Sequence, residues 1–360
     1  MDKMLHLLTE LLKIDSSTKE GANKGILYCQ AWLQHHGLQP TLLTNNGYHM
    51  LITEIGSGSV TLTLNGHVDV VSGNASQFVP FQDGNRLYGR GAADMKGGLA
   101  AMMAAVVELK DQRLPCKVQL QIVSDEETGG FHCSKFLSEQ GYVGDFLICG
   151  EPTMLHIGLQ AKGILQADVT IRGQAAHGSR PWEGINAIET AMSLYQRIFT
   201  LPFALEHSPF YEAPSINLAK IQGGDAYNKV PDCCTLSLDI RYLPHQSLDE
   251  IILQLEQLFD EKIKVGLCGD PIQTQPDDRW VKTLVTSIAQ TTKTEVKLFG
   301  QHGSADGRFF SRFGIPAVEF GPSGDGWHGD KEFVLLSSLY EYKNILTCFV
   351  MNFCVPTPKC

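Results

Sequence analysis

The chain has 360 residues, which is enough for one large or two moderate domains. Hydrophobic residues make up 43% of it and charged residues 19%, a balance typical of a soluble globular protein. The formal net charge is −10 and Lys and Arg form no cluster, so neither nucleic acid nor an anionic membrane is expected as a partner. An acidic balance of this kind suits a protein that gathers carboxylates around cations.

The N-terminal segment predicts an amphipathic helix rather than a targeting sequence. Leu5, Leu8, Leu11 and Leu12 fall on one face of residues 1–14, and the basic start and cleavage site of a secretory signal are missing. No stretch approaches 18 uninterrupted apolar residues, so no membrane-spanning helix is expected. The ten cysteines are scattered without a Cys-x-x-Cys pair, which favours reduced thiols in a cytoplasmic protein over disulfides or thiolate-bound zinc.

The next elements lead to a His-x-Asp motif. A second helix is expected over residues 25–36, and the apolar run 60–65 predicts a strand that delivers His67 and Asp69 into a turn. Because Val68 lies between them, the two side chains project to the same side of an extended segment. An aspartate placed in this way can fix the tautomer of a metal-binding histidine. Taken alone, the triplet is an ordinary polar strand end, so the interpretation depends on partners elsewhere.

Acidic residues recur at the ends of later elements. Asp94 stands just ahead of a helix expected over residues 99–109, where backbone N–H groups steady a carboxylate. The alternating strand 117–123 ends in Asp125-Glu126-Glu127, where repulsion among like charges indicates a compensating cation, with a solvated acidic turn as the alternative. The following short strand ends just before Glu151. In α/β sheets, sites are built at the carboxyl ends of strands.

The pattern changes at about residue 164. The segment that follows predicts two strand-helix-strand passes, which are typical of a ferredoxin-like α+β domain. The simplest architecture is therefore a three-layer α/β domain with a mixed, mostly parallel sheet, formed by residues 1–163 and 275–360, with residues 164–274 inserted. The remaining strands are expected at 165–172, 214–221, 233–241, 296–299 and 317–320, and the helices at 183–199, 248–259, 277–290 and 332–350.

The acids and histidines at element ends form one candidate metal site. Imidazole and carboxylate ligands without thiolate suit zinc, manganese or cobalt, and two such ions about 3.5–4 Å apart can activate one water. One bridging carboxylate plus a histidine and a carboxylate on each ion would need five ligands, which leaves Asp69 and one glutamate over. The candidates are His67, Asp69, Asp94, Glu126, Glu127, Glu151 and His328.

These motifs, in this order, resemble the co-catalytic zinc amidohydrolases. That family includes acetylornithine deacetylase, succinyl-diaminopimelate desuccinylase, aminoacylases and carboxypeptidase G. The resemblance extends from the first helix to His328. It rests on His67-Val-Asp69, Gly89-Arg-Gly-Ala-Ala-Asp-Met-Lys-Gly97, Asp125-Glu-Glu127, Gly150-Glu-Pro152 and Ala176-His-Gly-Ser179.

The resemblance implies a catalytic domain that holds two divalent metal ions, zinc first and cobalt or manganese as alternatives. It implies that Asp69 orients His67. Glu126 would be the general base that takes a proton from water and returns it to the leaving amine. The implied metal ligands are His67 and Glu151 on one ion, His328 and Glu127 on the other, and Asp94 between them.

The resemblance also gives the inserted region the role of a lid and dimerisation domain. His177 would donate to the oxyanion across the interface of a homodimer, although an ordinary loop histidine is the alternative. Asn228 and Arg241 match positions that contact the substrate's carboxylate, for which the planar fork of arginine is well shaped. Arg241 could equally form a salt bridge at the sheet edge.

Two signals conflict over the family member. Ser304-Ala-Asp-Gly-Arg-Phe309 resembles the desuccinylase loop and makes His302, Ser304 and Asp306 candidate substrate contacts, whereas Lys162 in Ala161-Lys-Gly163 is similar to acetylornithine deacetylase. We expect hydrolysis of an N-acylated amino acid in amino-acid biosynthesis, by a deacetylase or a desuccinylase. A dipeptidase or carboxypeptidase is the alternative within the family. A non-catalytic binding module that retains the fold is the alternative from another class.

Overall fold

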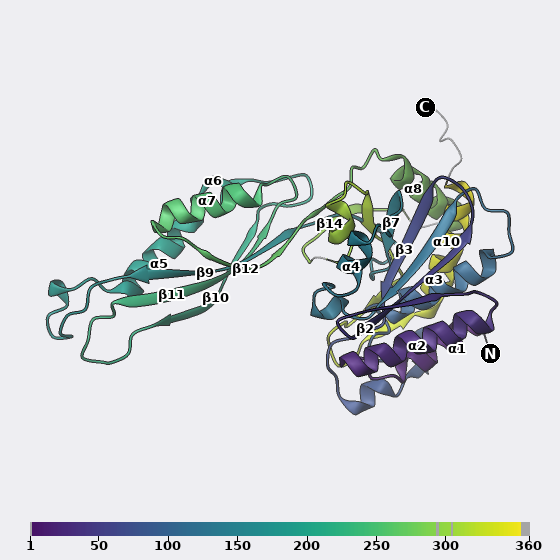
Figure 1. The fold of residues 1–360 in the computed structure, drawn as a ribbon, viewed down its shortest axis with the longest axis horizontal. Helices are drawn as coiled ribbons and strands as arrows, with labels where there is room; N and C mark the ends of the chain where they lie inside the picture. The colour runs from purple at the N-terminus through teal and green to yellow at the C-terminus, as the bar shows by residue number, and fades with distance from the viewer. Residues whose placement is uncertain (1, 293–294, 304, 354–360) are drawn as a thin grey trace. The chain divides into compact units, whose positions relative to one another are not determined.

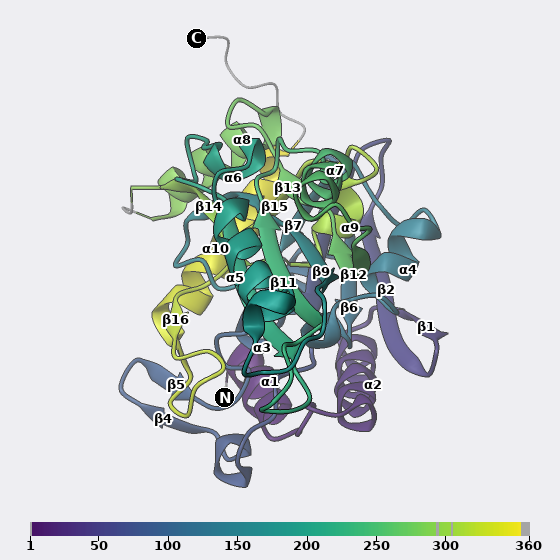
Figure 2. The same ribbon diagram turned by 90° about the vertical axis from the view of Figure 1, so that its left-hand side faces the viewer.

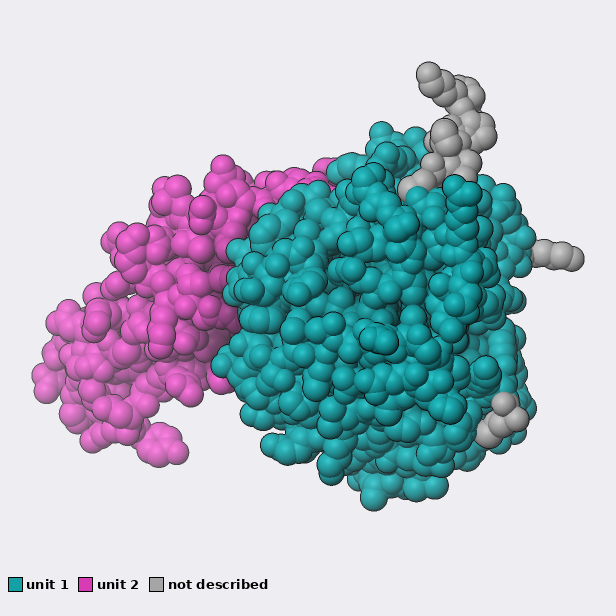
Figure 3. Space-filling view, turned by 45° about the vertical axis from the view of Figure 1, so that its right-hand side comes forward, with its two compact units in different colours: residues 1–159, 274–299, 305–360 teal, residues 160–273, 300–304 magenta. Residues whose placement is uncertain are grey.

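The computed structural model describes residues 2–292, 295–303 and 305–353. The chain divides into two compact units, coloured separately in Figure 3. Unit 1 comprises Met1–Leu159, Thr274–Phe299 and Ala305–Cys360, and unit 2 comprises Gln160–Gln273 with Gly300–Ser304. Residues 300–304, which the sequence-based boundaries left in the first domain, belong to unit 2, and the Tyr211 hydroxyl donates to the Gln301 carbonyl there.

Unit 1 is built on a mixed sheet whose central strands are parallel. Strand β3 (Thr61–His67) lies between β6 (Lys117–Val123) and β7 (Phe146–Cys149), and β15 (Ala317–Glu319) continues the parallel set beyond β7. The flanking pairs are antiparallel: β1 (Thr41–Asn45) pairs with β2 (Tyr48–Gly56), which pairs with β6, and β8 (Ile157–Ala161) pairs with β15. The last two residues of β8 belong to unit 2 and pair with β13 (Ile272–Gln273), and β14 (Leu298–Gln301) also pairs with β8. The predicted α/β fold with a mixed sheet is confirmed.

Helices cover both faces of this sheet. On β3, a side chain at Gly66 would meet Met95 and Leu99, at the start of α3 (Lys96–Leu109). The neighbouring Asn65 faces the opposite way and donates to the Ser134 hydroxyl of α4 (Ser134–Glu139). Alternate residues of one strand therefore point into two helical layers. Around α3 pack α1 (Lys3–Leu12) and α10 (Leu336–Asn352), with α8 (Arg279–Thr291) against α10 (Figure 1).

Several boundaries differ from the sequence-based prediction. Helix α2 (Lys19–His35) starts six residues earlier than expected, because the Thr18 side chain caps it by accepting from Gly21 N. Helix α5 (Ala187–Ile198) starts later than expected, since the Asn186 side chain accepts from the Ile188 and Glu189 amides.

The closing helix α10 also starts later, at Leu336 instead of residue 332, because Phe333–Leu335 form strand β17. Strand β17 pairs with β5 (Arg86–Tyr88) in a small antiparallel sheet that also contains β4 (Phe81–Asp83) and β16 (Gly324–Asp325). Figure 2 shows the yellow segment that contains β16 on the same side of the molecule as blue β4 and β5, although they are far apart in the sequence, and β17 lies between β16 and β5 in the sheet. Glu332 therefore lies in a loop.

Two hairpins are absent from the sequence-based prediction: β1 with β2, and β4 with β5. Strands β1 and β2 are joined at Asn46-Gly47, whose positive φ angles of 48° and 80° are those of a tight hairpin turn. The Asn-Gly dipeptide is the strongest short-range signal for such a turn, and it was available in the sequence.

Unit 2 is a four-stranded antiparallel sheet with helices packed against one face. The chain passes through β9 (Gly163–Arg172), α5, the short α6 (Pro202–Leu205), β10 (Ser215–Gly223), β11 (Cys233–Tyr242), α7 (Leu248–Phe259) and β12 (Lys264–Gly269). The strand order is β10-β11-β9-β12, the arrangement of a split βαβ motif (Figure 1). Alternate residues Leu165, Ala167, Val169 and Ile171 of β9 are buried in the core under the helices.

No helix in the described part of the chain is both long and apolar enough to cross a membrane.

Candidate metal centre

Three neighbouring parallel strands bring the candidate ligands of unit 1 to one edge of the sheet. His67 is the last residue of β3, and the register pairs it with Val123 on β6. Strand β6 leads into the short 3-10 turn η2 (Glu126–Thr128), and β7 is followed by Gly150 and Glu151. The sheet thus assembles residues that are up to 84 positions apart in the sequence.

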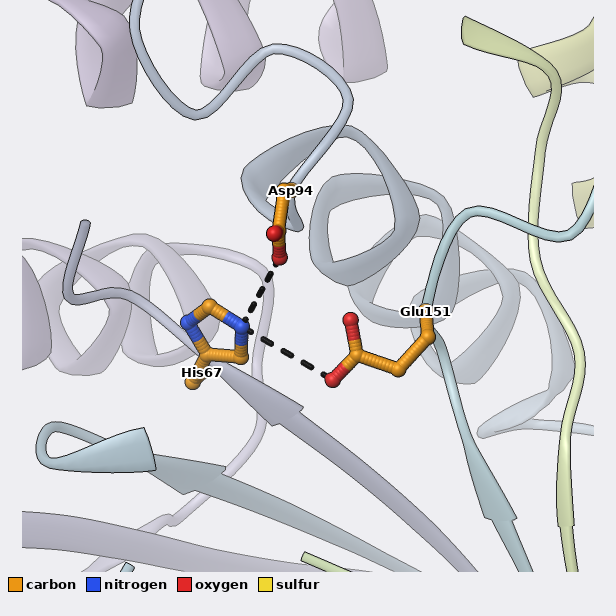
Figure 4. Close-up of side chains that lie close together, drawn as sticks. All are labelled: His67, Asp94 and Glu151. Carbon is orange, nitrogen blue, oxygen red and sulfur yellow. Dashed lines mark ion pairs between the residues drawn. The ribbon is translucent and has the colours of Figure 1, made fainter. Parts of the chain in front are cut away.

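The first donor group surrounds the ring of His67. Its Nε2 lies 3.3 Å from Asp94 Oδ1 and 3.8 Å from Glu151 Oε1 (Figure 4). The His67 side chain is only 1% exposed, and its Nε2 has no hydrogen-bond partner. A buried nitrogen without a partner is costly unless another group binds it.

The second donor group shares Asp94. His328 Nε2 lies 3.3 Å from Asp94 Oδ2 and 3.3 Å from Glu127 Oε2. Asp94 therefore turns one carboxylate oxygen to each histidine. Within each group the donor atoms lie within 4.8 Å of one another. Two imidazoles and three carboxylates, one of them shared, are a donor set that fits two divalent cations.

Asp69 acts on both sides of this centre. His67 Nδ1 donates to the main-chain oxygen of Asp69 at 2.9 Å, and Asp69 Oδ1 lies 3.5 Å from the same nitrogen. A proton fixed on Nδ1 leaves the Nε2 lone pair directed at Asp94 and Glu151. The other carboxylate oxygen of Asp69 accepts from Glu127 N at 2.9 Å. Asp69 thus connects His67 to the turn that carries Glu127.

Charge and burial set the protonation of the site. Burial would raise the pKa of Asp94, but the imidazoles of His328 and His67 beside its two oxygens outweigh burial and lower that pKa. The hydrogen bond to Asp94 raises the pKa of His328 to about 9. Burial raises the pKa values of Glu127 and Glu151 above the ordinary range. Protons and cations therefore compete for the same atoms.

Glu126 lies beside the two donor groups and belongs to neither. Its Oε2 is 4.0 Å from His67 Nε2. Burial, together with the nearby charges of Asp306 and Asp94, raises the pKa of Glu126 well above its ordinary value. A carboxylate whose pKa is shifted toward neutrality is suited to accepting and returning a proton.

The turn that carries Glu126 and Glu127 is held from the other side by residues of the segment 305–308. Arg308 Nη2 donates to the Gly129 carbonyl at 2.7 Å, and Asp306 Oδ2 accepts from the Ser134 hydroxyl at 2.5 Å. Both Asp306 and Arg308 are buried. Asp306, which the sequence made a candidate substrate contact, therefore lies inside the protein against α4. Ser304 lies outside the described residues, and His302 contacts the Tyr211 ring.

The other candidate substrate residues lie in unit 2. His177 and Asn228 are exposed, and His177 Nδ1 lies 2.8 Å from the Ser179 hydroxyl. Arg241 pairs with Asp239 of its own strand at 2.7 Å, a salt bridge on the inner strand β11 and not at the sheet edge. Lys162 is buried, and its Nζ donates to the Ala213 carbonyl at 2.8 Å.

Two buried side chains next to the donor groups have no role in the sequence-based prediction. Arg90 Nη1 and Glu332 Oε2 form an ion pair at 2.8 Å, and both side chains are at most 3% exposed. Arg90 lies in the Gly-Arg-Gly run before Asp94, and Glu332 follows His328 by four positions. The sequence contains one signal for these two residues: each is a charged residue close in the sequence to a candidate metal ligand.

The fold and the two donor groups are those of a metallohydrolase with two adjacent candidate cation sites. A model of peptidase family M20/M25/M40 matches residues 63–352, and the chain belongs to this family.

Individual relatives and solved structures are similar to this chain over most of its length. The chain is 33% identical to acetylornithine deacetylase of Edwardsiella ictaluri (strain 93-146), over 94% of this chain and 93% of that protein. Its fold is similar to that of aminopeptidase PepT from Bacillus cereus, with a TM-score of 0.83 and 18% identity over 97% of each chain. It is also similar to the Bacillus subtilis YXEP protein, a dinuclear metal-binding peptidase, with a TM-score of 0.69 and 13% identity over 97% of this chain and 99% of that one.

Proposed function

We propose that this enzyme hydrolyses the amide bond of an N-acylated amino acid and releases a carboxylate and a free amine. The observation that carries the proposal is the pair of donor groups that share Asp94, with the buried Glu126 beside both and part of neither. The likeness to acetylornithine deacetylase makes an N-acetylated diamino acid the first substrate to test. An N-succinylated amino acid is the alternative within the same chemistry.

Two divalent cations would occupy the site. Zinc is the first candidate, and cobalt or manganese are the alternatives. His67, Asp94 and Glu151 would hold one cation, and Asp94, Glu127 and His328 the other. When bound, such ions polarise the substrate carbonyl and lower the pKa of water toward about 7.

Glu126 would carry the proton. One of its carboxylate oxygens takes a proton from the attacking water and passes it to the nitrogen of the leaving group. The nitrogen needs this proton in order to leave as a free amine. The burial that raises its pKa brings its proton affinity closer to neutral pH, where both transfers are feasible. Asp69 fixes the His67 tautomer throughout.

The inserted unit would act as a lid and as the dimerisation surface. Several large apolar side chains of unit 2 are exposed, among them Trp182, Ile185, Met192 and Ile221. A second copy of the chain would cover such a surface. His177 would then donate a hydrogen bond to the oxyanion across the interface. The residues that would contact the substrate are Asn228, Arg241, Lys162 and Ser304. A wild-type chain that sediments as a monomer at micromolar concentration would contradict this assembly.

The proposal is tested with chelated and zinc-reloaded enzyme on matched N-acetyl, N-succinyl and dipeptide substrates. Zinc should restore hydrolysis of an N-acyl amino acid, and Glu126→Gln should lower kcat by about 10²–10⁴-fold while leaving zinc content unchanged. Absence of zinc uptake together with absence of hydrolysis would favour a binding module. Preference for dipeptides would favour the peptidase alternative, and a fully active Glu126→Gln variant would remove Glu126 from the role of base.

A further inference from the structure

One buried carboxylate binds the loop that carries Asp94. Glu332 Oε1 accepts from Ala93 N and from Asp94 N, each at 3.0 Å. Its Oε2 accepts from Gly91 N at 3.0 Å and from Arg90 Nη1 at 2.8 Å. Four donors therefore converge on a side chain that is 1% exposed. Hydrogen bonds from N–H groups to a carboxylate are shorter and stronger than those between neutral groups, so this side chain holds the loop firmly.

The same network joins the Asp94 loop to the segment that carries His328. Glu332 lies four residues after His328, and its main-chain oxygen accepts from Gly89 N at 3.1 Å. Arg90 Nη2 reaches back to the His328 carbonyl at 3.4 Å. The two loops come from the parts of unit 1 that precede and follow unit 2 in the sequence, and the hydrogen bonds described between them centre on Arg90 and Glu332.

The remaining ligands are held by other means. His67 ends the central strand β3, Glu151 follows β7, and the hydrogen bond of Gly150 N to Asn65 O ties these two strand ends together. None of these contacts involves Glu332. A disturbance at Glu332 therefore moves Asp94 and His328, and leaves the frame of His67 and Glu151 in place.

We propose that Glu332 is a positioning residue for the second cation position, acting through Asp94 and His328 with Arg90 as its charge partner. This inference rests on the proposed two-cation centre. The carboxylate is required because four hydrogen-bond donors face it. An amide of the same size would turn an NH₂ group toward N–H donors, and an aspartate would lack one methylene of reach.

The test is a titration of chelated protein with Co²⁺, followed by the visible absorption of the bound ion and by equilibrium dialysis. The wild-type chain should take up two equivalents. Loss of the Glu332 carboxylate disturbs one donor of the first position, Asp94, and two donors of the second, Asp94 and His328. Glu332→Gln should therefore bind the second equivalent roughly 10–100-fold more weakly and weaken the first by less. Leu284→Ala, in the buried core of α8, is the matched control, which should lower the thermal midpoint and bind both ions like the wild type.

Three results would overturn the inference: wild-type titration by Glu332→Gln, equal weakening of both equivalents, or selective loss of the second ion in Leu284→Ala. Should Glu332→Gln fail to fold, Arg90→Met takes its place, since it keeps the three backbone bonds to Glu332. Weakening of the second ion in Arg90→Met supports the inference, and unchanged binding contradicts it. A wild-type chain that binds fewer than two ions would instead remove the proposed two-cation function itself.

Discussion

The two histidines of the centre are held in different ways. His67 is the end of a central parallel strand and is 1% exposed, whereas His328 lies in a loop at a positive φ of 63° and is 53% exposed. Hydrogen bonds of the sheet fix the first, and side-chain contacts between loops fix the second. The shared Asp94 belongs to the loop side, since Glu332 accepts from its amide. A sheet therefore makes one half of the site rigid, and a buried ion pair supports the other.

The largest effects are expected from removing either histidine. His67→Ala and His328→Ala should each abolish binding of one Co²⁺. Each should lower kcat/KM by more than roughly 100-fold, the largest effect expected when a residue that only supports a metal ligand is changed. The two variants should lose different amounts of unfolding free energy, because His67 is buried among the strand ends and His328 is half exposed. Metal titration and thermal unfolding of the two chelated variants measure both effects. Equal loss of stability would contradict the contrast between sheet-held and loop-held ligands.

Asp69→Ala should have the next largest effect. It removes a carboxylate that lies near His67 Nδ1 and accepts from Glu127 N, so it touches the first cation position and the turn that carries a ligand of the second. We expect metal affinity and activity to fall roughly 10–100-fold. The main-chain bond from His67 Nδ1 to the residue 69 carbonyl survives the substitution. Loss of one whole equivalent of Co²⁺ would instead make Asp69 a ligand.

The smallest effect concerns the buried carboxylate of Asp306 behind the Glu126 turn. Burial, followed by the charge of Asp125, raises the pKa of Asp306 from 3.8 to about 7. The folded protein therefore holds this proton more tightly than the unfolded chain, so the contribution of Asp306 to stability falls as the pH rises from about 4 to about 7. Asp306→Asn removes this dependence. The stability of Asp306→Asn relative to the wild type should therefore rise between pH 5 and pH 8, as measured by urea unfolding.

If the difference in unfolding free energy between Asp306→Asn and the wild type stays constant from pH 5 to pH 8, the predicted rise in the pKa of Asp306 is wrong. Ser134→Ala is the matched control, because it removes the hydroxyl that donates to Asp306 and leaves the carboxyl in place. This variant should keep a pH dependence of the same sign as the wild type.

The sequence predicted the elements whose patterns are local and strong. Residues 117–123 and 248–259 form β6 and α7 at the expected boundaries, because strict alternation and a capped amphipathic pattern leave little choice. It failed at residues 19–24, where Gly21 and Gly25 weaken the helical signal. Gly21 is in fact needed, since a side chain there would overlap the Asp15 carbonyl oxygen. Glu332 was placed in a helix because its pairing with Arg90, 242 positions away, has no local signal.

The sequence by itself determined that imidazoles and carboxylates follow the strands of a mixed α/β sheet, because side-chain chemistry and residue periodicity are properties of the chain. Only the tertiary structure decided that Asp94 divides its two oxygens between His67 and His328, and that Glu332 is directed at the Asp94 loop. It also decided that Asp306 faces α4 from inside the protein. Each of these outcomes is a distance between segments remote in sequence, which depends on how sheet, loops and helices pack together.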